Sequence, residues 1–173
     1  DKSFKQETMP NLKTILFCGE KLLAGTAKKI QERFKNIKII NSYGPTECTF
    51  AITSIEITQK MIEENDIPIG IAKSDVKIYI VDENLQEQRS GETGEILITG
   101  KSVAKGYIGE NKGKFIIYKG ENAYLTGDIG YFKNGKLYYV ARKDKQIKYK
   151  GYRIELLDIE ENLYKLGYVE KAV

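Results

Sequence analysis

The sequence predicts an α/β segment, a small antiparallel β-barrel and the start of an α+β unit, in that order. Three observations support this prediction. A strand, helix, strand pattern fills the first part of the chain. Short strand-like runs separated by turn residues follow, and Asn134-Gly135 among them is a strong hairpin signal. A basic strand-like run and an apolar pattern at helical spacing close the chain. We expect the three parts to span residues 1–74, 75–143 and 144–173.

The first part reads as a right-handed βαβ unit. Thr14 to Cys18 is an apolar run, so we expect both faces to be buried, as is typical of a parallel strand. Thr26 is placed to cap a helix that runs to about Asn36, and Lys38 to Asn41 begins the second strand. Because ligands bind outside the carboxyl ends of such strands, the loops that follow the two strands should be neighbours. These polar loops are Cys18 to Glu20 and Asn41 to Glu47.

Alternating strands and turns predict the barrel. Ala51 to Ile57 alternates as a strand does, and Thr58 is placed to cap a helical turn after it. A connector over residues 65–74 follows. The barrel strands are then Val76 to Val81, Glu95 to Thr99, Lys114 to Tyr118 and the two arms of the Asn134-Gly135 hairpin. We expect them to form a small antiparallel barrel or sandwich.

The pattern changes again after Asp144. Gln146 to Tyr149 is strand-like, because apolar residues alternate there with lysines. Four apolar side chains then fall on one helical face, which predicts a helix. They are Leu156, Ile159, Leu163 and Leu166. Tyr168 to Val173 reads as the start of another strand, and we expect the chain to be truncated there.

Composition excludes several kinds of site. The 173 residues contain no histidine, which removes Ser-His-Asp triads, Cys-His pairs and histidine zinc sites. A net charge of +4, from 28 basic and 24 acidic side chains, is too small to indicate nucleic-acid binding by itself. Two cysteines are too few for a disulfide framework and favour a reducing, cytoplasmic compartment. No apolar run is long enough to span a bilayer, so we expect no membrane insertion.

One candidate binding cluster lies between Tyr43 and Glu47. Gly44-Pro45 forces a tight turn, and Tyr43 before it offers a ring face to a planar base. Thr46 and Glu47 supply a hydroxyl and a carboxylate, which suit phosphate and Mg²⁺. The alternative is a turn that caps the next segment, with Tyr43 in the core.

A second candidate cluster joins Thr126-Gly127-Asp128 to Arg142. The first stretch reads as a short turn that presents one carboxylate, and the arginine lies one hairpin later. A carboxylate and a guanidinium that converge in this way suit the hydroxyls of a ribose. The alternative is an ordinary surface hairpin with solvated charges.

Two further stretches have competing interpretations. Gly19 allows a ligand to approach the backbone closely, whereas Cys18 beside it has the usual character of a small buried hydrophobe. The basic run from Arg142 to Arg153 carries Tyr149 and Tyr152, a combination that can bind RNA. A solvated strand face and a docking surface for an acidic partner protein are the alternatives.

Four motifs, in order, resemble those of the adenylate-forming superfamily, which includes adenylation domains, acyl-CoA synthetases and luciferases. They are NSYGPTE at Asn41 to Glu47, GEI to GY at Gly94 to Tyr107, YLTGD at Tyr124 to Asp128, and the run from Arg142 to Glu155. The last run differs in one respect, because Ala141 directly before it stands in place of the superfamily's glycine. LFCGEKL and YGPTECT are most similar to ligases that load D-alanine onto a carrier protein for teichoic-acid D-alanylation. Nonribosomal-peptide adenylation domains for another amino acid and acyl-CoA ligases are the alternatives.

The resemblance implies roles in binding the base and phosphates of ATP. Tyr43 would stack on the adenine, Tyr139 would approach the other face, and Asn41 would bond the amino group. Thr46 would contact the α-phosphate, and Glu47 would help hold Mg²⁺. Thr46 and Glu47 are the catalytic residues that this resemblance implies.

The resemblance also implies a ribose site and an amino-acid pocket. Asp128 and Arg142 would hydrogen-bond to the ribose hydroxyls. Cys18 would line the D-alanine pocket, together with Gly19 and Ser42.

The last implied roles concern a mobile C-terminal lid. Asp144 would be its hinge, and Gly151 would line the tunnel for the phosphopantetheine arm of an acidic carrier protein. A phosphate-binding loop and a C-terminal lysine of the superfamily have no counterpart in these 173 residues. We therefore expect an internal piece of the enzyme, inactive alone. It would comprise the rear βαβ part of the large domain, the β-barrel subdomain and the beginning of the lid.

Overall fold

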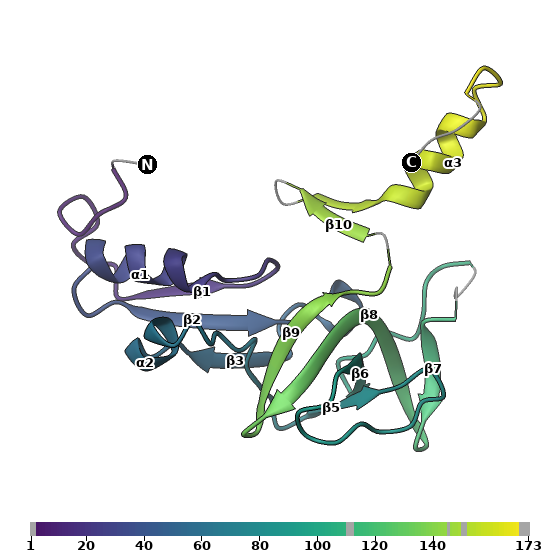
Figure 1. Ribbon diagram of the computed structural model, residues 1–173, viewed down its shortest axis with the longest axis horizontal. Coiled ribbons are helices and arrows are strands. Elements are labelled where there is room, and N and C mark those ends of the chain that lie inside the picture. Colours follow the sequence, from purple (N-terminus) through teal and green to yellow (C-terminus); the bar gives the residue numbers. More distant parts are fainter. Residues whose placement is uncertain (1–2, 110–112, 145, 150–151, 170–173) are drawn as a thin grey trace.

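Three sheets follow one another along the chain in the computed structural model, which describes residues 3–109, 113–144, 146–149 and 152–169 (Figure 1). The first sheet contains β1 to β4, the second β5 to β9, and the third β10 and β11. The breaks between them fall after Ala72 and after Arg142. No helix in these ranges is both long and apolar enough to cross a bilayer.

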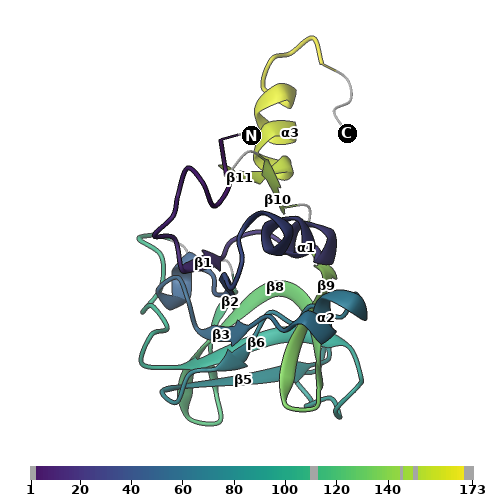
Figure 2. The ribbon, with the colours of Figure 1, turned by 90° about the vertical axis from the view of Figure 1, so that its left-hand side faces the viewer.

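The first sheet contains the predicted parallel pair. β1 and β2 run parallel with α1 between them, and β3 and β4 extend the sheet in antiparallel fashion. Figure 2 shows α1 and α2 on the same side of this sheet, where their apolar side chains form one cluster with Ile39 and Ile57. The elements are β1 (Thr14–Phe17), α1 (Ala24–Arg33), β2 (Lys38–Tyr43), the 3₁₀ helix η1 (Thr46–Cys48), β3 (Thr53–Glu56), α2 (Gln59–Glu63) and β4 (Ile71–Ala72).

Local predictions for this part are confirmed in some places and wrong in others. Thr58 caps α2, since its hydroxyl accepts a hydrogen bond from the Met61 N–H at 3.4 Å. Thr26 does not cap α1: the helix begins at Ala24, so Thr26 lies in its first turn. The helix also ends at Arg33, because Phe34 turns to an extended backbone and is buried in the core. β1 is covered on one face only, and 53% of Leu16 is exposed on the other.

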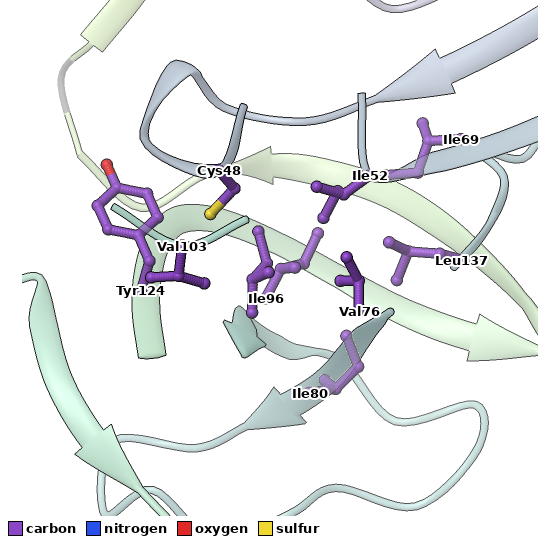
Figure 3. Close-up of a cluster of buried hydrophobic side chains, with 10 residues drawn as sticks. Cys48, Ile52, Ile69, Val76, Ile80, Ile96, Val103, Tyr124 and Leu137 are labelled. Carbon is purple, nitrogen blue, oxygen red and sulfur yellow. The ribbon is translucent and has the colours of Figure 1, made fainter. Parts of the chain in front are cut away.

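The second sheet is antiparallel and curls into a half-barrel (Figure 1). Figure 3 shows its core, in which Val76, Ile80 and Leu137 pack with Cys48 and Ile52 from the preceding part. The apolar core therefore crosses the boundary expected at residue 74. The strands are β5 (Val76–Val81), β6 (Gly94–Gly100), β7 (Phe115–Tyr118), β8 (Glu121–Lys133) and β9 (Lys136–Arg142).

The turn predicted at Thr126-Gly127-Asp128 is wrong, because these residues lie inside the continuous strand β8. The pairing of β6 with β8 shifts register across them, and Gly127 has a φ of +73°. Its N–H donates to the Glu95 carboxylate at 2.9 Å. Glycine permits this left-handed backbone inside a strand, and such interruptions re-aim the neighbouring side chains. The glycine therefore marks a bulge rather than a chain reversal.

The third part contains β10 (Gln146–Tyr149), β11 (Tyr152–Glu155) and α3 (Leu156–Tyr164). The two strands pair in antiparallel fashion, and the unit stands apart from the larger sheets in Figure 1. The predicted helix is confirmed up to Tyr164, with Leu166 beyond its end. The strand expected at Tyr168 to Val173 falls largely outside the described residues.

Candidate functional site

A cleft of about 630 Å³ lies between the first two sheets, and Gln146 at the start of β10 also lines it. This volume is in the range of small-molecule binding sites. The carboxyl ends of β1 and β2 form one wall, as the βαβ pattern predicts, and the bulge of β8 forms another. Among the lining residues are Cys18, Gly19, Tyr43, Thr46, Thr126, Asp128, Arg142 and Gln146.

Asp128 presents a fixed carboxylate to this cleft. The Tyr43 hydroxyl donates to its Oδ2 at 2.6 Å, and Arg142 Nη1 donates to its Oδ1 at 2.8 Å. Arg142 stands directly opposite Asp128 in the β8–β9 ladder, and its Nη2 also donates to the Thr126 carbonyl at 3.2 Å. Only 6% of Asp128 is exposed. An ionised carboxylate has about four acceptor positions, and Tyr43 and Arg142 donate to two of those on Asp128.

The surroundings keep these groups in defined charge states. Burial, and then the negative charge of Asp128, raises the pKa of the Tyr43 hydroxyl well above its ordinary value, so Tyr43 stays a neutral donor. Burial acts to lower the pKa of Arg142, but Asp144 and Asp128 prevail and raise it. The site therefore combines a carboxylate, a guanidinium and a neutral phenol. Tyr139 is half-buried in β9, outside the residues that line the cleft, and burial followed by Asp128 raises its pKa.

Asp144 holds the other side of Arg142. Its Oδ1 accepts from Arg142 Nε and its Oδ2 from Nη2, each at 2.7 Å, and Lys114 Nζ lies 3.2 Å from Oδ2. Burial acts to raise the pKa of Asp144, but Arg142 and Lys114 outweigh it and lower this pKa to about 2. Gly127 leaves the space for the pair, since a Cβ there would lie 2.7 Å from Asp144 Oδ2.

Asn41 and Ser42 lie beneath the cleft wall and not on it. Both are buried in β2, and neither lines the cleft. The Asn41 side-chain amide donates to the Pro68 carbonyl at 2.8 Å, and the Ser42 hydroxyl donates to the Thr53 carbonyl at 2.5 Å. In this conformation their polar side-chain groups are hydrogen-bonded to the backbone carbonyls of neighbouring segments.

Glu47 is also buried, in η1 next to the cleft-lining Thr46. The Tyr107 hydroxyl donates to its Oε1 at 2.5 Å. Within the described part of the chain, no three Cys, Asp or Glu side chains gather closely enough to hold an ion by themselves. Mg²⁺ is commonly held by one or two protein carboxylates together with substrate phosphates. Glu47 is a single carboxylate of this kind, but in this conformation it does not line the cleft, although Thr46 beside it does.

The two cysteines differ in their surroundings. Cys18 lines the cleft, whereas Cys48 is fully buried in the barrel core. Burial, and then the charge of Glu47, raises the pKa of the Cys48 thiol to about 12. Cys48 is therefore a protonated core residue and not a nucleophile.

The basic run predicted from residue 142 onward begins with paired side chains. Arg142 faces the cleft carboxylates, and Lys143 Nζ lies 3.4 Å from Glu95 Oε2. Lys145, Lys150 and the predicted tunnel residue Gly151 lie outside the described residues. The run therefore does not begin as the solvated cationic strip that an RNA surface requires.

Several residues that line the cleft were given no binding role from the sequence. Gln146 is 4% exposed at the start of β10 and reaches the cleft from the third sheet. Thr126 lines the cleft and donates its hydroxyl to the Ile96 carbonyl at 2.8 Å, which fixes the bulge. Both residues lie inside one of the four motifs described above, and this membership was the sequence feature that could have marked them as site residues. Leu23 and Phe50 also line the cleft, and nothing in their local pattern marks them.

A buried acid, a guanidinium and a phenol beside a tight turn are chemically suited to a nucleotide. The family model described as AMP-binding enzyme matches residues 1–108. The chain belongs to the AMP-binding enzyme family. It is 45% identical over its whole length to the D-alanine--D-alanyl carrier protein ligase of Bacillus licheniformis and 48% identical to that of Bacillus cytotoxicus. The chain spans about 35% of the length of these relatives.

Solved adenylation domains have the same fold. The chain superimposes with a TM-score of 0.80 on PA1221, a nonribosomal peptide synthetase protein with adenylation and PCP domains, at 31% identity over 90% of this chain and 33% of that one. With the Vibrio cholerae adenylation domain AlmE in complex with glycyl-adenosine-5'-phosphate, the TM-score is 0.84 at 30% identity, over 98% of this chain and 34% of that one. The predicted α/β plus β fold class is therefore confirmed.

Proposed function

We propose that this chain is part of an ATP-dependent ligase that adenylates D-alanine and transfers the alanyl group to the phosphopantetheine thiol of a carrier protein, for teichoic-acid D-alanylation. The observation that supports it most is 45–48% identity along the whole chain to ligases of that name. Residues 1–74 and 75–143 would belong to the large domain, and residues 144–173 would begin the lid.

In this proposal the cleft binds ATP. Asp128 accepts hydrogen bonds from the ribose hydroxyls, and Arg142 donates hydrogen bonds to them. Both residues line the cleft, and their hydrogen bond to each other already fixes their positions. Tyr43 stacks on the adenine, and Thr46 bonds the α-phosphate. Tyr139 and Asn41 complete the adenine site. Neither lines the cleft in this conformation, so both must move locally to reach the base.

The amino acid lies in the same cleft, beside Cys18 and Gly19, which also line it. A carboxylate oxygen of D-alanine attacks the α-phosphorus, and pyrophosphate leaves. The carrier thiol, after losing its proton, then attacks the acyl carbon, and AMP leaves. Positioning and charge neutralisation dominate such a reaction. Mg²⁺, held by Glu47 and the nucleotide phosphates, would supply part of that neutralisation.

The experiment is D-alanine-dependent pyrophosphate exchange by the full-length protein that contains this chain, followed by loading of labelled D-alanine onto a carrier protein. We expect D-alanine to give the highest exchange in a panel with L-alanine, glycine and other amino acids. AlmE, solved with a glycyl adenylate, makes glycine the principal competitor. Highest exchange with a different amino acid would support the rival adenylation function, and no exchange with any amino acid would refute both.

A further inference from the structure

Lys114 is a charged side chain that lies outside the four motifs and contacts Asp144, a partner of the cleft residue Arg142. It directly precedes β7, and its carbonyl accepts a hydrogen bond from the Leu125 N–H of β8 at 2.8 Å. Its Nζ lies 3.2 Å from Asp144 Oδ2. The side chains of Lys114 and Asp144 are 28% and 25% exposed, so solvent screens this ion pair less than a surface pair. The fold thus fixes both ends of the contact.

Asp144 connects three elements of the fold. It binds Arg142 of β9 through two hydrogen bonds, Lys114 beside β7 through an ion pair, and the Gln146 N–H of β10 at 3.3 Å. Lys143, its chain neighbour, is engaged elsewhere, with Glu95. Lys114 is therefore a contact through which the barrel holds Asp144 independently of Arg142.

Arg142 is shared between two carboxylates. Its Nη1 donates a hydrogen bond to Asp128, while its Nε and Nη2 donate to Asp144. A guanidinium is a rigid planar fork, so the place of Asp144 determines where Nη1 points. If Asp144 moves, Arg142 either follows it and leaves Asp128 or loses a bidentate partner.

We propose that Lys114 is a positioning residue for nucleotide binding: it fixes Asp144, through Asp144 it orients Arg142, and so it raises the affinity of the cleft for the ribose of an adenine nucleotide. The inference rests on the proposed function, because it takes Asp128 and Arg142 as the ribose site. Lys114 itself does not line the cleft.

The test is calorimetric titration of AMP into the full-length protein and its variants. We expect Lys114→Met to weaken AMP binding about 3- to 10-fold and to raise the ATP KM similarly, with kcat for pyrophosphate exchange changed less than twofold. Lys114→Arg, which keeps the charge, should restore most of the affinity. Lys35→Met, at an exposed lysine between α1 and β2, is the matched control and should bind AMP as the wild type does.

A double-mutant cycle with Asp144→Asn separates positioning from general destabilisation. If Lys114 acts through Asp144, adding Lys114→Met to Asp144→Asn should weaken AMP binding by less than a further factor of two. Fully additive effects, or unchanged AMP affinity in Lys114→Met, would overturn the inference alone. AMP binding by the wild type without amino-acid-dependent exchange would overturn the proposed function alone. Failure of the wild type to bind AMP would overturn both.

Discussion

Substitution of Gly127 by alanine should disturb the site through one added methyl group. Gly127 has a φ of +73°, and a Cβ there would lie 2.7 Å from Asp144 Oδ2 and 3.0 Å from Arg142 Nη2. The left-handed backbone alone costs an alanine about 1–2 kcal/mol. Displacing the partly buried Asp144–Arg142 pair removes charge-assisted hydrogen bonds that contribute about 1.5–3 kcal/mol. Because the pair can shift and not break completely, we expect the free energy of unfolding to fall by about 2–4 kcal/mol in total.

Urea denaturation of the chain measures this change, and Gly135→Ala is its matched control. Gly135 has nearly the same φ, +72°, but an added Cβ would meet no atom within 4 Å. The control should therefore lose only the backbone contribution, about 1–2 kcal/mol. Equal losses in the two variants would refute the close packing of Asp144 and Arg142 on Gly127.

Three further predictions concern Asp144 and Cys18. The folded pKa of Asp144, about 2, is below its ordinary value, so its stabilisation is present above about pH 4 and is lost as the pH falls through about 2. Acid unfolding curves should therefore show the wild type losing about 2 kcal/mol more than Asp144→Asn over that interval, and parallel curves would contradict the lowered pKa. Cys18→Leu in the full-length protein should change the ratio of D-alanine to glycine activation about 10- to 200-fold, measured by pyrophosphate exchange; a constant ratio would make Cys18 a packing residue only. Asp144→Pro should keep the pyrophosphate exchange of Asp144→Ala, which already lacks the carboxylate that holds Arg142, and should reduce carrier loading by orders of magnitude below that of Asp144→Ala, because proline fixes φ at a proposed hinge. Equal loss in both assays relative to Asp144→Ala would indicate misfolding.

Elements that depend on local pattern were predictable from the sequence. The parallel strands around α1, the Thr58 cap and the Asn134-Gly135 hairpin all follow from spacing and residue type within a few positions. The prediction of a turn at Thr126-Gly127-Asp128 was wrong because it also depended on local pattern alone. A glycine flanked by polar residues gives one local signal for a turn and for a bulge, and the partner strand β6 decides between them.

Some of the motif residues predicted for the candidate site lie together in the cleft, and others do not. Tyr43, Asp128 and Arg142 meet in one cleft although 85 residues separate the first two. Asn41 is turned to the Pro68 carbonyl, a contact that depends on the tertiary packing of the connector. Lys114 could not be found from sequence, because an isolated lysine before a strand has no distinguishing pattern, and its partner Asp144 lies 30 residues away.

The most direct test of the proposed ribose site is the affinity of the full-length protein for a stable D-alanyl-adenylate analogue, measured by calorimetry in the wild type, Asp128→Ala and Asp75→Ala. Asp75 is exposed and lies outside the cleft, so its variant controls for loss of a negative charge. Hydrogen bonds that involve a charged group contribute about 1.5–3 kcal/mol, so we predict that Asp128→Ala weakens binding about 10- to 150-fold. Asp75→Ala should bind as the wild type does. Equal affinity in all three proteins would contradict the assignment of Asp128 to the nucleotide.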